Sequence, residues 1–296
     1  MLDKRIKKFI PLIAVFLIFF VGFGIFWSRA PVLIVTDNAF NRLYGEQRLN
    51  RQRQRLSLQF FRRVIPVLVA DTAGPDLIAI AVEAAHSNPW AVLFPYRYLD
   101  GARHYKENRP EVPVLVMTGR NSAPGGESPL YFVLTDVAED IFRSGMAAAF
   151  FAGEKRALFL FDGYLAPRYK EIFTEGLRAG GNIAEPVFFS AALDFAVFTD
   201  IGCVVVAGPA TRFLERNLDI PVLLFSWIDP AVSPRSVKIV FDDSPWALAR
   251  QALKDFPPQA GEIRVPSAPT IIRNRIEENA DFRRLKAIIQ EKYEKK

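Results

Sequence analysis

The chain has 296 residues, of which 50% are apolar and 24% are charged, and its formal net charge is +6. This composition excludes a largely disordered chain and is sufficient for the cores of one or two domains. The basic excess does not indicate nucleic-acid binding, because the sequence has no helix-turn-helix signature, zinc-ligand set or interleaved aromatic pattern.

An uncharged run of 19 residues, Phe9–Trp27, stands near the amino terminus. It approaches the roughly 20 residues that a helix needs to cross a bilayer. Four basic residues precede it and only Arg29 follows closely, so residues 1–8 are expected to be cytoplasmic, and the chain from Pro31 onward extracytoplasmic; the four are Lys4, Arg5, Lys7 and Lys8. We therefore expect residues 9–27 to form a transmembrane helix or uncleaved signal anchor, and the protein to be a single-pass protein of the cell inner membrane.

Cleavage as a signal peptide is the alternative, because Ser28 and Ala30 are small residues in an A-x-A-like arrangement. The long apolar run, the interfacial character of Trp27 and the proline at position 31 favour retention.

Beyond Pro31, short apolar runs alternate with helical stretches, as repeated βα units do. Continuous apolar strands without alternation are typical of parallel strands that are covered on both faces. The expected strands are Val32–Thr36, Val64–Ala70, Ala91–Pro95, Val112–Thr118, Leu130–Thr135, Arg156–Phe161, Ala184–Phe189, Gly202–Ala207, Ile220–Phe225 and Val237–Phe241. The expected helices are Phe40–Phe61, Asp76–Ser87, Gly101–Asn108, Val137–Ala152, Pro167–Ala179, Thr211–Asn217 and Trp246–Asp255.

Ten strands are more than one such sheet usually holds, so the pattern predicts two sheets and hence two lobes. The turn-rich loop Gly119–Pro129 falls near the middle of the strand series, where a crossing between lobes is expected. Residues 276–296 are expected to form a charged amphipathic helix, with Phe282, Leu285 and Ile289 on one stripe. A solvated surface helix is favoured there over a docking element.

The order of these pieces resembles the type I periplasmic binding protein superfamily, to which ribose-binding receptors and the effector domains of lac-repressor-type regulators belong. The similarity covers about Pro31 to Arg275. Its pieces are Val133–Asp136 followed by Gly145–Ala149, then Ala157–Phe161, Tyr169–Leu177, Pro221–Asp229, Ser236–Leu253 and Ile271–Arg275. The transmembrane segment stands in the place of the regulators' DNA-binding headpiece.

The resemblance implies an α/β fold of two Rossmann-like lobes with parallel sheets, joined by a hinge. The apolar run described above adds one transmembrane helix before them. The resemblance assigns residues 31–134 and 229–258 to lobe 1, and residues 135–228 and 259–275 to lobe 2. A small polar ligand, sugar- or nucleoside-like, is then expected in the cleft between the lobes, outside the carboxyl ends of the strands.

The candidate ligand-binding residues follow the ends of expected strands, where rings can stack on flat ligand faces and polar groups can form directional hydrogen bonds. They are Asp37, Asn38, Phe40, Tyr96, Arg120, Asp136, Asp162, Tyr164, Trp227 and Asp229, and Arg97 adjoins Tyr96. Asp37, Asn38 and Asp136 could instead cap the helices that follow them. The stretch Val205–Ala210 lacks the asparagine–aspartate pair of sugar receptors, which predicts either a different ligand or a loss of binding.

Few residues indicate catalysis. His86 and His104 belong to no metal-binding motif, no nucleophile elbow or P-loop occurs, and the single cysteine, Cys203, lies in an apolar run that predicts a buried thiol. We therefore expect no enzyme activity, cofactor or metal site. The main hypothesis is a solute-binding protein for transport or sensing, with a transporter or signalling membrane partner. The alternative is a degenerate binding-protein fold that acts as an envelope scaffold or interaction module.

Overall fold

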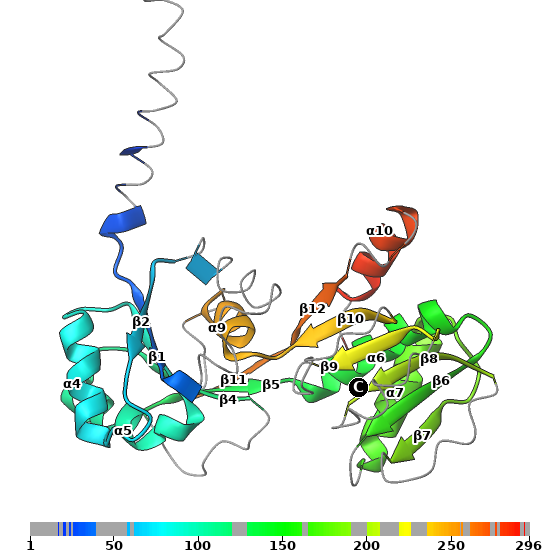
Figure 1. Ribbon diagram of the computed structural model, residues 1–296, viewed down its shortest axis with the longest axis horizontal. Helices are drawn as coiled ribbons and strands as arrows, with labels where there is room; N and C mark the ends of the chain where they lie inside the picture. Colours follow the sequence, from blue (N-terminus) through cyan, green and yellow to red (C-terminus); the bar gives the residue numbers. More distant parts are fainter. Residues whose placement is uncertain are drawn as a thin grey trace, which may run out of the picture. The chain divides into compact units, whose positions relative to one another are not determined.

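The computed structural model describes residues 17, 20, 21, 24, 26–39, 58, 59, 62–119, 129–161, 165–190, 200–207, 219–225, 236–254, 256, 261–272, 276, 279–290 and 293 (Figure 1). Within these residues the chain forms two six-stranded sheets and separates into two compact units. The first unit is Met1–Met117, Gly125–Phe132 and Gln259–Gly261, and the second is Thr118–Pro124, Val133–Pro258 and Glu262–Lys296. The expectation of two α/β sheets is confirmed.

The first sheet has the strand order β11-β5-β4-β3-β1-β2. Its strands are β1 (Val32–Thr36), β2 (Val64–Leu68), β3 (Ala91–Pro95), β4 (Val114–Gly119), β5 (Tyr131–Thr135) and β11 (Glu262–Val265). β1 lies between β2 and β3 in parallel register, and all its residues are buried, as continuous apolar runs predict. β2 is the edge strand, where Pro66 is tolerated because its missing N–H costs no ladder hydrogen bond on the outer side.

Two helices cover one face of this sheet: α4 (Pro75–Ala85) contacts β1 and β2, and α5 (Leu99–Asn108) contacts α4 and β3 (Figure 1). α4 begins with a proline at its first turn, whose fixed φ and missing N–H suit that position. The expected helix Phe40–Phe61 lies outside the described residues except for Leu58 and Gln59, which are helical.

The second sheet has the order β12-β10-β9-β8-β6-β7. It contains β6 (Arg156–Phe161), β7 (Val187–Ser190), β8 (Ile201–Val206), β9 (Val222–Phe225), β10 (Val237–Asp242) and β12 (Ala268–Ile271). Its strands pair in parallel except for β12, which runs antiparallel to β10. Alternate residues of its strands form two apolar clusters, one on each face; Cys203 is fully buried in one of them.

α6 (Val137–Ala152) and α7 (Pro167–Ala179) pack closely on one face of the second sheet. A Cβ on Gly145 would lie 2.5 Å from the Phe173 carbonyl oxygen, and a Cβ on Gly176 would overlap the Phe142 carbonyl. Glycine at both positions therefore allows the two helix backbones to approach each other. α6 ends at Gly153, whose φ of 60° lies in the left-handed region.

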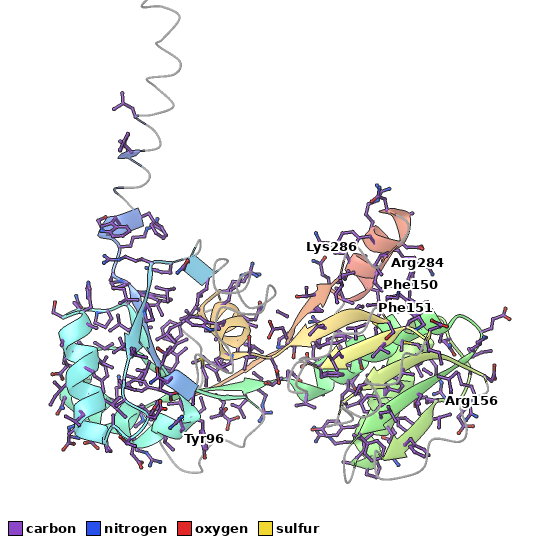
Figure 2. All side chains as sticks on the ribbon, in the orientation of Figure 1. Tyr96, Phe150, Phe151, Arg156, Arg284 and Lys286 are labelled. Carbon is purple, nitrogen blue, oxygen red and sulfur yellow. The ribbon has the colours of Figure 1, made fainter. Side chains whose placement is uncertain are left out.

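Two expectations need correction. Residues 229–258 were assigned to the first lobe, yet β10 pairs with β9 in the second sheet; of that range it is α9 (Pro245–Lys254) that contacts β11. The apolar stripe of the C-terminal segment is not solvated, because α10 (Asn279–Ile288) packs on α6 and Leu285 and Ile289 are 0% and 4% exposed. Arg284 and Lys286 of α10 are exposed, and the Arg284 guanidinium lies 5.5 Å from the centre of the Phe150 ring on α6 (Figure 2).

The expected anchor, residues 9–27, lies largely outside the described residues. Among those that are described, no helix combines the length and the apolar character that crossing a membrane requires. The expected helix Thr211–Asn217 and most of the loop Gly119–Pro129 also lie outside them.

Candidate functional site

Three neighbouring strands, β2, β1 and β3, end at the same edge of the first sheet and carry polar residues there. β1 is followed by Asp37 and Asn38, and β2 leads within a few residues to Asp71. β3 is followed by the short 3-10 helix η1 (Tyr96–Tyr98). The parallel direction of the strands gathers side chains that lie far apart in the sequence, at the edge where ligands bind in open α/β sheets.

The carboxylate of Asp37 is the buried centre of this cluster. Asp37 is 0% exposed. The Tyr98 hydroxyl donates a hydrogen bond of 2.5 Å to Asp37 Oδ2, and Arg97 Nη1 lies 2.9 Å from the same oxygen. The Arg97 guanidinium also lies 4.9 Å from the centre of the Tyr98 ring. The charge of this buried carboxylate is balanced by the Arg97 cation, and the Tyr98 hydroxyl adds a hydrogen bond; both groups come from η1.

Asp71 joins the end of β2 to the same cluster. Arg97 Nη2 donates to the Asp71 carbonyl oxygen at 3.1 Å, and the Asn38 backbone N–H donates to Asp71 Oδ1 at 3.0 Å. Arg97 therefore links the ends of all three strands.

The surroundings of Tyr98 at this edge keep the proton on its hydroxyl. Burial, together with the hydrogen bond to Asp37, raises the pKa of Tyr98 well above its usual value. The phenol thus remains a donor at physiological pH. Because Asp37 holds its Oδ2 between Tyr98 and Arg97, the guanidinium of Arg97 is fixed in position.

Part of the cluster stays open to solvent. The Arg97 side chain is 44% exposed, and Tyr96 is 37% exposed on the surface of the first unit (Figure 2). A guanidinium has five N–H donors, and among the described residues only one on Nη1 and one on Nη2 are used. Arg97 can therefore donate further hydrogen bonds to hydroxyl, carbonyl or anionic oxygens of a ligand, beside the Tyr96 ring.

In the second unit, Asp136 serves as the N-cap of α6. Its Oδ1 accepts a hydrogen bond of 3.2 Å from the Glu139 backbone N–H, and its own N–H donates to the Val265 carbonyl oxygen at 2.7 Å. This is the capping alternative that the sequence left open. A ligand contact of Asp136 stays a prediction.

The remaining sequence candidates divide into two groups. Asp37, Asn38 and Tyr96 come together at the edge described above. Six others lie outside the described residues and stay predictions: Phe40, Arg120, Asp162, Tyr164, Trp227 and Asp229.

Sequence reasoning missed Asp71 and Tyr98 in the first unit. Asp71 directly follows the expected strand Val64–Ala70, a signal that could have found it; Tyr98 had no such signal, because its role depends on the 3-10 turn of η1.

It also missed the pair of Asp140 and Ser267 in the second unit. The Ser267 backbone N–H donates to Asp140 Oδ1 at 2.8 Å and its hydroxyl donates to Oδ2, and both residues are buried. The 127 residues that separate them hide the pair in the sequence. It ties α6 to the link between β11 and β12, which is a structural role.

The described titratable residues do not form a metal centre. No group of three or more His, Cys, Asp or Glu among them could hold a metal ion. The histidines make local contacts: His86 Nδ1 accepts a hydrogen bond from the Asn88 N–H, and His104 Nε2 lies 3.5 Å from Asp76 Oδ1. Burial raises the pKa of the Cys203 thiol well above its usual value, so the thiol stays protonated.

No protein-family model matches the sequence, and no curated protein is significantly similar to it. The structure is similar to a transcriptional activator of the comK gene from Bacillus halodurans, with a TM-score of 0.55 and 10% identity over 88% of this chain and 96% of that one. It is also similar to an ABC transporter system solute-binding protein from Conexibacter woesei, with a TM-score of 0.52 and 11% identity over 89% and 95% of the two chains. At such identities the likeness concerns the fold alone.

Proposed function

We propose that this chain is a membrane-anchored extracytoplasmic solute-binding protein, and that the edge formed by Asp37, Asp71, Arg97 and Tyr98 is part of its ligand-binding site. The observation that carries the proposal is the fixed guanidinium of Arg97. It is held by groups from three adjacent strand ends while part of its side chain remains open to solvent. A donor that is held in place before a ligand arrives loses little conformational freedom on binding.

The proposed ligand is a small polar molecule of the sugar or nucleoside class. Arg97 supplies donors for ligand oxygens, and the adjacent Tyr96 ring, exposed by 37%, can stack on a flat sugar or base face. The proposal includes no catalytic step and no cofactor.

The anchor and the location complete the proposal. The apolar run Phe9–Trp27 with basic residues before it supports a single inner-membrane span with the two units outside the cytoplasm. Among its described residues, Leu17, Phe20 and Val21 are about 60% exposed, as side chains that face lipid would be. A transporter or signalling protein in the same membrane would receive the ligand or the signal.

The test is a thermal-stability screen of the full chain in detergent against sugars, nucleosides, polyols and amino acids. A ligand at 100 times its dissociation constant stabilises the folded state by about 2.7 kcal/mol. We expect one chemical class to raise the melting temperature, and Tyr96→Ala and Arg97→Ala to weaken that ligand's affinity by about tenfold or more. Arg103→Ala, at an exposed position on α5, is the matched control and should bind normally.

Tyr96→Ala keeps the test independent of folding, because Tyr96 is exposed and makes no contact with Asp37 that the structure shows. Unchanged melting with every compound, for a chain that unfolds cooperatively, would refute ligand binding.

A scaffold role is the second candidate. It is favoured by the pairing of charges at this edge, since Asp37 already has partners in Arg97 and Tyr98 without any ligand. A folded chain that binds nothing in the screen would support it.

A further inference from the structure

The amino ends of β1, β2 and β3 also lie side by side, at the opposite edge from Asp37. The Val32 N–H donates to the Arg63 carbonyl oxygen at 2.9 Å, and the Trp90 N–H donates to the Pro31 carbonyl oxygen at 2.8 Å. The residues that immediately precede the three strands are thus Pro31, Arg63 and Trp90. The N-terminal segment enters the first unit at this edge.

Two arginines at this edge stack on tryptophans. The Arg63 guanidinium lies 4.6 Å from the centre of the Trp27 ring, and its Nη1 donates to the Trp27 carbonyl oxygen at 3.4 Å. The Arg62 guanidinium lies 4.0 Å from the centre of the Trp90 ring. Stacking engages the flat face of a guanidinium and leaves the N–H groups around its rim able to bind a phosphate.

Arg29 adds a third positive charge. Burial, with a smaller contribution from Arg29, lowers the pKa of Arg62 from its ordinary value. Among the described parts of the chain, none of Arg29, Arg62 and Arg63 forms an ion pair with a carboxylate. Like charges gathered without an anion repel one another, and a bound anion would relieve that repulsion.

Along the chain just before this edge, the side chains change in the order in which the layers of a membrane change. Leu17, Phe20 and Val21 are exposed apolar residues, Trp27 is 54% exposed, and the arginines follow. Apolar side chains suit the hydrocarbon, tryptophan suits the interface, and arginine suits the phosphate layer. A soluble acidic partner would match the arginines but not the exposed apolar residues before them.

We infer that Arg29, Arg62 and Arg63, with Trp27 and Trp90, form a binding surface for the phosphate groups of anionic phospholipids. This surface, the arginine–tryptophan cluster, seats the amino edge of the first sheet on the bilayer. The inference rests on the membrane-anchored part of the proposed function and assigns a role to residues outside the ligand edge.

The experiment uses the full chain in nanodiscs of phosphatidylcholine alone or of phosphatidylcholine with phosphatidylglycerol. Hydrogen exchange is measured for peptides that contain residues 29–32, 62–64 and 90–92. We expect exchange to be several-fold slower in the anionic discs. The difference should shrink at about 1 M salt, where the Debye length falls to about 3 Å.

Variants distinguish lipid binding by the arginine–tryptophan cluster from an effect of the overall positive charge. Arg62→Gln with Arg63→Gln should abolish the lipid dependence, and Arg29→Gln alone should reduce it, which provides a milder variant at an exposed position. Arg103→Gln with Arg178→Gln removes the same charge from exposed sites on α5 and α7 and should leave the dependence intact.

Equal exchange in both kinds of disc would overturn the inference, and so would a lipid dependence that survives the Arg62 and Arg63 substitutions. Failure of the chain to remain in either disc would overturn the anchor as well. Retention in the discs with equal exchange would overturn the cluster alone. The thermal-stability screen tests ligand binding separately, so its outcome does not depend on any of these results.

Discussion

At the two ends of β1, β2 and β3, the charged side chains differ in whether they have partners of opposite charge. At the carboxyl ends, the carboxylate of Asp37 is fully buried and receives an arginine and a tyrosine from its own chain. At the amino ends, Arg62 and Arg63 stack on tryptophan rings and meet no carboxylate among the described residues. A charge that is buried must be satisfied within the fold, whereas a charge at the surface can remain available for an external partner.

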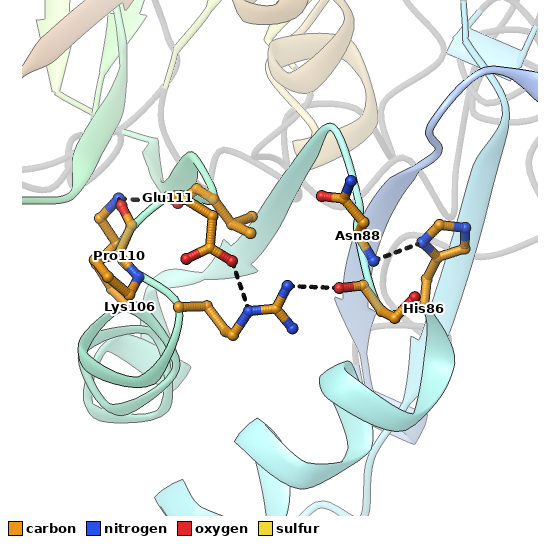
Figure 3. A network of polar contacts seen from close by, with 8 residues as sticks. His86, Asn88, Lys106, Pro110 and Glu111 are labelled. Carbon is orange, nitrogen blue, oxygen red and sulfur yellow. Dashed lines mark hydrogen bonds and ion pairs between the residues drawn. The ribbon is translucent and has the colours of Figure 1, made fainter.

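The loops that precede β3 and β4 show that the amino edge is not uniformly open (Figure 3). Lys106 donates to the carbonyl oxygens of Pro110 and Val112 at 2.7 and 2.9 Å. Arg109 pairs with Glu111 and donates to the Ser87 carbonyl oxygen, which joins the two loops. Lys106, near the end of α5, and Arg109 are thus engaged by local contacts. Among the described residues, the positive charge without a carboxylate partner at this edge therefore lies near the N-terminal segment.

The largest effect is expected from Asp37→Ala, which removes the buried centre of the carboxyl edge. Tyr98 and Arg97 would both lose their partner, and we expect the free energy of unfolding to fall by about 2–3 kcal/mol. Urea denaturation would measure it. Asp100→Ala is the matched control, because Asp100 forms an exposed pair with Arg103, and it should cost less than about 1 kcal/mol. Equal losses for the two variants would contradict the contrast between buried and exposed charge.

Lys106→Met tests the closed part of the amino edge. The substitution keeps the aliphatic stem but removes the hydrogen bonds to two carbonyl oxygens, and should cost about 1 kcal/mol. Hydrogen exchange should accelerate in residues 109–113. If exchange in this loop stays unchanged, the lysine does not hold it.

Tyr105→Phe tests a buried hydroxyl on α5. Tyr105 is 0% exposed, and its hydroxyl has no hydrogen-bond partner in the part of the chain that the structure describes. At neutral pH the variant should be as stable as the parent or more stable by less than about 1 kcal/mol.

The pH dependence of the same variant provides a second readout. Burial raises the pKa of Tyr105 from 10.0 to about 12. Because the folded-state pKa is raised, the associated stability is present below pH 10 and is lost as the pH rises from 10 to about 12. Tyr105→Phe should lose less stability over that interval, as measured by denaturation at each pH. An identical slope in both proteins would show that the phenol titrates normally.

The smallest effect is expected from Arg62→Gln and Arg63→Gln in detergent without anionic lipid. Neither arginine has an ion pair within the described residues, so each change should alter the free energy of unfolding by less than about 0.5 kcal/mol. A large loss would show that these residues stabilise the fold, which would weaken the case for a lipid-binding surface.

The helices and central strands were predictable because their signals are local. α6 and α7 occupy the expected residues, since a capping aspartate, a first-turn proline and terminal glycines mark their ends. β1, β3 and β6 also match, because continuous apolar runs leave little choice of boundary. β11 and β12 were missed: each has only four residues, and neither is a continuous apolar run.

The site was only partly predictable because partners distant in sequence determine it. Asp37, Asn38 and Tyr96 were found by the rule that strand ends face the ligand. The hydrogen bond from Tyr98 to Asp37 spans 61 residues, and no local pattern announces it. The assignment of β10 failed for a similar reason, since an apolar strand fits either sheet until its neighbours are known.

The last helix has a practical consequence for how this chain can be shortened. Leu285 and Ile289 of the C-terminal segment belong to the same apolar cluster as Phe159, Phe173 and Cys203. The backbone N–H of Tyr293 then donates to Glu139 Oε2, and its ring lies 4.9 Å from that of Phe142 on α6. Removing residues 276–296 as a dispensable tail would uncover part of this cluster and favour aggregation, so a tag or fusion should not replace this segment.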